Sequence, residues 1–309
     1  SGVVACVHAR PTAVPRAVGG GRTAPQTQGQ CRNHRACPRR EPGSSSGGDR
    51  RSVRDGHAPV VHPIERIGRI APRMHRSARI VIAVDMPTVA LNNGYSIPLV
   101  GLGTSPMLGR PCIRAVSTAL RNGYRLIDTA TKYSNELSVG MGITASAVPR
   151  NDIVIQTKLA GGDQGFDEAI NAAKDSGRRL GIDHLDIYLI HWPCPSLGKT
   201  VESWKALLTL VDEGYVRVAG VSNFKRHHLQ LLYDETGRWP ALNQIQCSPA
   251  LQRTELREFM AEKGIHTQAW HPTGSKEGLL GDPSIIRLAR KYGKSPTQIA
   301  LKWAVTHGI

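Results

Sequence analysis

The stretch GYRLIDTATKYSNELSVG, residues 123–140, sets both the fold and the chemistry that we predict for this chain. Its first half reads as a short buried strand over 125–129, and a turn then leads to a helix that starts near Asn135. Asp128 lies at the carboxyl end of the strand, and Tyr133 is held a few residues beyond it. The stretch therefore predicts a carboxylate and a phenol at the same end of one strand.

Two later strands end in a similar way. DIVIQTKL places Lys158 at its tip, and LDIYLIHWP places His191 at its tip. The carboxyl ends of successive parallel strands meet on one face of a β/α barrel, and catalytic groups of such barrels lie on that face. We therefore expect one proton-donating site formed by Asp128, Tyr133, Lys158 and His191.

The chemistry of these four groups can be argued from their types. Reducing a carbonyl group requires a hydride on carbon and a proton on oxygen. A phenol has an unperturbed pKa of about 10, and a nearby ammonium lowers that pKa because it stabilises the phenolate. We assign Tyr133 as the general acid, Lys158 as the group that tunes it and Asp128 as the anchor of Lys158. His191 would hydrogen-bond the carbonyl oxygen and orient it.

Each of these residues also has a plainer interpretation. Asp128 could cap a turn, and Tyr133 could pack between surface and core. Lys158 could be solvated at a strand end, and His191 could be a core histidine beside Trp192. The joint occurrence of all four at strand ends favours the catalytic interpretation.

The remainder of the chain alternates strands with helices. Apolar strand patterns cover 99–103, 126–130, 153–158, 185–191, 216–222, 242–247 and 265–270, and most are followed by an amphipathic helix pattern. This order predicts a parallel sheet covered by helices. A hairpin around Asn92-Asn93-Gly94 precedes the first of these strands. Asp282-Pro283 and the capping box at Ser295-Pro296-Thr297-Gln298 predict two closing helices.

From residue 86 onward the chain resembles the aldo-keto reductases. The motifs that carry the resemblance are GLGT (101–104), IDTATKYSNE (127–136), TKL (157–159), IHWP (190–193), GVSNF (220–224), NQIQCSP (243–249) and AW (269–270). They occur in the order and at the spacing of the family, whose prokaryotic members include enzymes like 2,5-diketo-D-gluconate reductase. The resemblance implies a (β/α)8 TIM barrel with an N-terminal hairpin, and it implies the same four catalytic residues.

The resemblance also implies a nicotinamide cofactor, usually NADPH, as the hydride source. Ser222, Asn223 and Gln244 would bind the carboxamide, and Trp270 would stack on the nicotinamide ring. Trp192 and His191 would contact the substrate, for which we expect a broad range of aldehydes and ketones. No strand–GxGxxG–helix unit for a dinucleotide occurs in the barrel.

The family's eighth strand carries a Pro-Lys-Ser element and a downstream Arg that grip the cofactor's 2′-phosphate. The sequence ends at Ile309, about where this strand would begin. We therefore expect a barrel that lacks its eighth strand and final helix, with two exposed strand edges. A catalytically inactive, truncated reductase is the alternative function.

Residues 1–85 differ from the rest in composition. They carry 15 Arg, no Lys and 5 acids, and they lack Trp, Phe and Tyr. We expect a disordered basic extension over 1–85, with a short edge strand at 78–85 as an exception, and the barrel domain over 86–309. We favour a natural start at Met86; a nucleic-acid-binding arm is the alternative, and a signal or transit peptide is disfavoured.

Composition also bears on redox state, metal binding, membrane insertion and partners. The six cysteines show no disulfide framework, and Cys31, His34 and Cys37 supply only three metal ligands, so we expect a reduced, cytoplasmic protein without a metal. No apolar run is long enough for a membrane span. We expect a monomer that acts on a small carbonyl substrate, with no membrane and no nucleic-acid partner.

Overall fold

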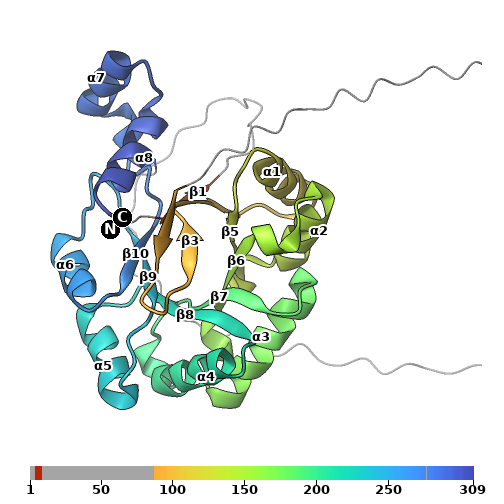
Figure 1. The fold of residues 1–309 in the computed structure, drawn as a ribbon. Coiled ribbons are helices and arrows are strands. Elements are labelled where there is room, and N and C mark those ends of the chain that lie inside the picture. The colour runs from red at the N-terminus through yellow and green to blue at the C-terminus, as the bar shows by residue number, and fades with distance from the viewer. Residues whose placement is uncertain (1–3, 9–86, 276) are drawn as a thin grey trace, which may run out of the picture. The chain divides into compact units, whose positions relative to one another are not determined.

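The seven predicted strands form most of a parallel ring. The computed structural model describes residues 4–8, 87–275 and 277–309 (Figure 1). The predicted strands are β4 (Val100–Gly103), β5 (Leu126–Asp128), β6 (Val154–Leu159), β7 (Leu185–Ile190), β8 (Val216–Ser222), β9 (Leu242–Gln246) and β10 (His266–Trp270). Each pairs in parallel with its neighbours in chain order. The apolar patterns thus located every one of these strands to within two residues.

The N-terminal stretch differs from the expectation. We predicted disorder over 1–85 and an open barrel, but β1 (Val4–His8) lies between β10 and β4, parallel to both, and closes the ring. The prediction of two exposed edges is wrong, because this extended segment pairs with the backbone groups of both edge strands. The remainder of 1–85, including the strand expected at 78–85 and the Cys31, His34 and Cys37 group, lies outside the described residues. The domain boundary at residue 86 stays a prediction.

Helices surround the ring (Figure 1). They are α1 (Gly109–Arg121), α2 (Glu136–Ser146), α3 (Phe166–Leu180), α4 (Thr200–Asp212), α5 (Arg226–Thr236), α6 (Thr254–Glu262), α7 (Pro283–Tyr292) and α8 (Pro296–Thr306). Helix α7 packs on α8 rather than on the strands (Figure 1). Asp282 caps α7, and Ser295 with Gln298 forms the predicted capping box of α8. In the part of the chain that the structure describes, none of the helices has the length and apolar character needed to cross a membrane.

The predicted hairpin closes the amino end of the barrel. β2 (Thr88–Ala90) pairs antiparallel with β3 (Ser96–Pro98) around the Asn-Asn-Gly turn. Leu91 and Ile97 from this hairpin pack with inward-facing strand residues such as Leu126 and Ile187. The hairpin therefore supplies the apolar floor of the barrel interior.

The interior changes from apolar to polar along each strand. Inward-facing residues alternate along a strand, so β6 contributes first Val154, then Gln156, then Lys158, and all three are buried. β5 behaves alike, with Leu126 near the floor and Asp128 at the carboxyl end. The buried polar groups thus collect at the carboxyl ends of the strands, where the site was predicted.

Candidate active site

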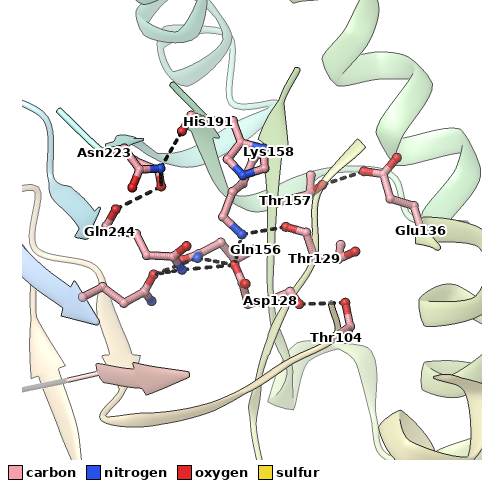
Figure 2. Close-up of polar contacts among 12 residues, drawn as sticks. Thr104, Asp128, Thr129, Glu136, Gln156, Thr157, Lys158, His191, Asn223 and Gln244 are labelled. Carbon is pink, nitrogen blue, oxygen red and sulfur yellow. Dashed lines mark hydrogen bonds and ion pairs between the residues drawn. The ribbon is translucent and has the colours of Figure 1, made fainter. Parts of the chain in front are cut away.

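Asp128 and Lys158 form a fully enclosed ion pair. Lys158 Nζ lies 2.5 Å from Asp128 Oδ1 and also donates to the carbonyl oxygen of Thr129 at 2.9 Å (Figure 2). The lysine side chain has no exposed surface, and the aspartate is also buried. A charge in such a place persists only when it is paired and hydrogen-bonded. The predicted anchor of Lys158 is therefore present.

Tyr133 faces this pair from the turn after β5. It ends a short 3₁₀ helix, η1 (Thr131–Tyr133), and is half-buried. Lys158 Nζ lies 5.1 Å from the centre of the tyrosine ring, and the ring of His191 meets it edge to face at 5.6 Å. The structure thus brings all four predicted catalytic residues together at the carboxyl ends of the strands, a region that we call the mouth of the barrel.

The turn that presents Tyr133 is fixed by two residues that sequence reasoning did not single out. Asn135 accepts from Thr129 Oγ1 at 2.6 Å and donates to the carbonyl oxygen of Met107 at 2.9 Å. Glu136 accepts from Thr157 Oγ1 at 2.5 Å and from Arg179 at 2.7 Å. Both side chains are buried, so they hold the start of α2 to neighbouring elements on either side of Tyr133. Their presence inside the family motif was the signal that could have found them.

His191 is a neutral imidazole in this environment. Its pKa is lowered to about 3, chiefly by burial; the ammonium groups of Lys158 and Lys132 contribute to the lowering, and Asp128 opposes it. Its Nδ1 atom is buried and has no hydrogen-bond partner among the described residues. A neutral imidazole has one N–H group, which can donate a hydrogen bond to a carbonyl oxygen.

The four predicted cofactor residues lie together: Ser222 ends β8, Asn223 follows it, and Gln244 and Trp270 lie on β9 and β10. Asn223 Nδ2 donates to the carbonyl oxygen of His191 and to Ser222 Oγ, each at 3.0 Å. Trp270 Nε1 donates to Asn223 Oδ1 at 2.8 Å, and Ser222 Oγ donates to the carbonyl oxygen of Gln244 at 2.9 Å. Asn223 adopts a left-handed backbone conformation, which directs its side chain back over the strand ends. The cluster is continuous with the four predicted catalytic groups.

Trp192 lies on the rim of this mouth. Its side chain is 46% exposed, and its carbonyl oxygen accepts from Gln164 at 2.7 Å, which ties the loop after β7 to the loop after β6. Leu197, in the same loop, is also exposed. The rim therefore offers apolar surface next to the buried polar groups at the strand ends, as a substrate contact would require.

Gln156 and Gln268 were not predicted as site residues, yet they lie directly beneath the site. Gln156 Nε2 donates to Asp128 Oδ1 at 2.6 Å and to Gln268 Oε1 at 2.8 Å. Both are fully buried. Gln156 interrupts the apolar run that begins at Ile153, and this was a sequence signal for it, whereas Gln268 lies in a more polar strand that gave no such signal.

Comparisons with known proteins identify the family. Residues 100–308 match the profile of the "Aldo/keto reductase family". An "Aldo-keto reductase" of Mycolicibacterium smegmatis is 47% identical over 222 residues, 72% of this chain and 80% of that protein. A "2,5-diketo-D-gluconic acid reductase B" of Corynebacterium sp. is 40% identical over 224 residues, 72% of this chain and 81% of that protein.

A solved structure extends the agreement to the fold. A mutant of Gox0644, determined in complex with NADPH, superimposes with a TM-score of 0.69 at 37% identity, over 72% of this chain and 81% of that chain. Residues 100–308, which match the family profile, contain β4 to β10 and every residue of the mouth described above. By sequence and by structure, this chain belongs to the aldo/keto reductase family.

Proposed function

We propose that this chain reduces aldehydes or ketones to alcohols, with NADPH as the hydride source and Tyr133 as the proton donor. One observation carries the proposal: the ammonium of Lys158 is fully buried, 2.5 Å from Asp128 and 5.1 Å from the ring centre of Tyr133. An enclosed cation beside a phenol is an arrangement for stabilising a phenolate, and the fold itself does not require a buried cation at the carboxyl ends of the strands.

The residues present fit a nicotinamide. Proteins of the family use NADPH, and Gox0644 was solved with it. Ser222, Asn223 and Gln244 offer hydroxyl and amide groups, which a carboxamide needs because it both donates and accepts. Trp270, half-buried beside them, offers a flat apolar face. NADPH bound there would supply the hydride.

The proton transfer follows from the positions of the four groups. The substrate oxygen would lie between the Tyr133 hydroxyl and the His191 ring, which meet edge to face. As the carbonyl carbon gains a hydride, the oxygen takes the phenolic proton from Tyr133. The remaining phenolate is stabilised by the ammonium of Lys158, which Asp128 keeps charged and in place. Neutral His191 orients the oxygen by donating an N–H.

The rim supports a broad substrate range. Trp192 supplies a partly exposed apolar wall, and apolar walls discriminate weakly between carbonyl compounds that differ by a methylene group. We propose simple aromatic and aliphatic aldehydes as good substrates.

The test is NADPH oxidation by the purified chain with a panel of aldehydes, compared with the Tyr133→Phe variant. We expect kcat to fall about 10²- to 10⁴-fold, because the general acid is removed. Calorimetric NADPH affinity should stay unchanged. Tyr124→Phe is the matched control, because this half-buried tyrosine precedes the same strand at the opposite end of the barrel. Equal turnover of the Tyr133→Phe variant and the wild type would refute the proposed mechanism.

A further inference from the structure

Three glutamines meet in the barrel interior beneath the proposed nicotinamide site. Gln156 comes from β6, Gln244 from β9 and Gln268 from β10, and all three are buried. β6 and β10 lie on opposite sides of the ring. Gln268 Oε1 accepts from Gln244 Nε2 at 2.6 Å and from Gln156 Nε2 at 2.8 Å. Gln268 therefore links the two sides of the barrel.

The carboxylate of Asp128 fixes the orientation of this cluster. Its Oδ1 atom accepts from Gln156 Nε2 at 2.6 Å and from Gln244 Nε2 at 3.3 Å, in addition to Lys158 (Figure 2). An ionised carboxylate can only accept hydrogen bonds, so both amides must turn their nitrogen toward it. Gln268 must then present its oxygen to these same two nitrogens. The charge on Asp128 thus orders three amides.

This order determines which atom Gln244 can offer to a ligand. Its amide nitrogen is turned inward, where it donates to Asp128 and Gln268. The amide oxygen is the atom that can accept from a ligand N–H. A carboxamide NH₂ group is such a donor. Without Gln268, the amide of Gln244 would lose the shorter of its two inward bonds.

A purely structural role explains the cluster poorly. Gln156 Oε1 and Gln268 Nε2 are buried and have no hydrogen-bond partner among the described residues. Buried polar atoms without partners lower stability, and apolar side chains at both positions would avoid this loss.

We propose that Gln268, held by Gln156, is a positioning residue that fixes the amide of Gln244 for the NH₂ group of the nicotinamide carboxamide. The inference rests on the proposed function, because it assumes NADPH at this site. It couples cofactor recognition to the Asp128–Lys158 pair, since the same carboxylate oxygen serves Lys158 and orders the amides.

The experiment compares two cofactors and two substitutions in the full chain by calorimetry. The cofactors are NADPH and its acetylpyridine analogue, in which a methyl ketone replaces the carboxamide and removes its N–H donors. We expect Gln268→Leu to raise the Kd for NADPH about threefold to tenfold, as for one lost hydrogen bond. The Kd for the analogue should not change, because the NH₂ group that Gln244 would accept from is missing.

Gln268→Glu is the rescue variant, because a carboxyl group that stays protonated beside the carboxylate of Asp128 still offers its carbonyl oxygen to both amide nitrogens. Its Kd for NADPH should stay within about twofold of the wild type. Thr267→Val, at the neighbouring buried position that faces the other side of β10, controls for damage to the strand. Circular dichroism establishes that each variant is folded.

The outcomes separate the inference from the function beneath it. Equal losses for NADPH and the analogue in Gln268→Leu would overturn the inference alone, because they would indicate a general distortion. Failure of Gln268→Glu to restore affinity, while folded, would do the same. A wild-type chain that binds neither cofactor would overturn the proposed function, and the inference with it.

Discussion

Two buried carboxylates, Asp128 at the carboxyl end of the barrel and Asp186 at its amino end, are paired with cations that differ in exposure. At the carboxyl end, Asp128 is paired with a lysine that has no exposed surface. At the amino end, Asp186 is equally buried, but its nearest cation, Arg150 at 2.6 Å, has a side chain that is 26% exposed. Arg217, at 3.5 Å, is 41% exposed.

The difference separates a structural ion pair from the pair that we propose is catalytic. Asp186 also accepts from the backbone N–H of Ile155 at 2.9 Å, so it ties β7 to β6 while its arginines keep contact with water. Lys158 keeps no such contact and instead lies near Tyr133. Enclosing a cation costs desolvation energy that an exposed cation avoids. The ion pair with the larger desolvation cost lies at the end of the barrel where the chemistry is proposed.

Lys158→Met should have the largest effect, because it leaves Asp128 as a buried charge without its cation. We expect a loss of about 3–5 kcal/mol in the free energy of unfolding, measured with urea, and loss of turnover. The double variant Lys158→Met with Asp128→Asn should recover most of the stability and none of the turnover. A loss below about 1 kcal/mol in the single variant would mean that enclosure is not costly here.

Asp186→Asn should cost less, about 1–3 kcal/mol, because Arg150 and Arg217 can turn to solvent when the carboxylate is neutralised. Turnover should stay within about twofold of the wild type, since no residue of the mouth contacts this carboxylate. Urea unfolding and aldehyde reduction measure the two quantities. If this variant lost more stability than Lys158→Met, exposure of the cation would not distinguish the two ends.

His191 should make the carboxyl end sensitive to acid. Its folded pKa is about 3, below the value of about 6.5 in an unfolded chain, so the unfolded state binds the extra proton between these values. Stability therefore falls as pH falls through this window, by about 1.4 kcal/mol per pH unit for one proton. His191→Gln should reduce the slope of unfolding free energy against pH by that amount between about pH 4 and 6. An unchanged slope would contradict the depressed pKa.

Arg238→Ala should have the smallest effect. Arg238 pairs with Asp212 at 3.0 Å, but both side chains are well exposed, at 47% and 65%. We expect a change of at most about 0.5 kcal/mol in the free energy of unfolding, measured with urea and reduced further by salt. A loss as large as that of Asp186→Asn would show that burial of the carboxylate is not the deciding variable.

Local signals predicted much of the fold. The seven strands were found because each is an apolar run of strand length, and the ends of α7 and α8 were found because Asp282 and Ser295 act within one turn of their own helix. The positions of Asp128, Lys158 and His191 followed because a strand end is visible in the sequence and the carboxyl ends of parallel strands share one face.

Non-local features escaped prediction. The pairing of β1 with β4 and β10 joins segments that are far apart in the chain. The five residues of β1 are too few for a hydrophobic pattern to predict a strand. The meeting of Gln156 with Gln268 depends on which faces of β6 and β10 point inward once the ring closes. The depressed pKa of His191 depends on burial, which no motif encodes.

The sequence by itself determined the types of the proposed reacting groups, their positions at or just after strand ends and the family of the chain, because these are properties of short segments. The tertiary structure decided that the ammonium is enclosed, that a neutral imidazole meets the phenol ring edge to face, and that three amides take their orientation from one carboxylate. The physical reason is that desolvation and hydrogen-bond direction arise only when distant strands close around a common interior.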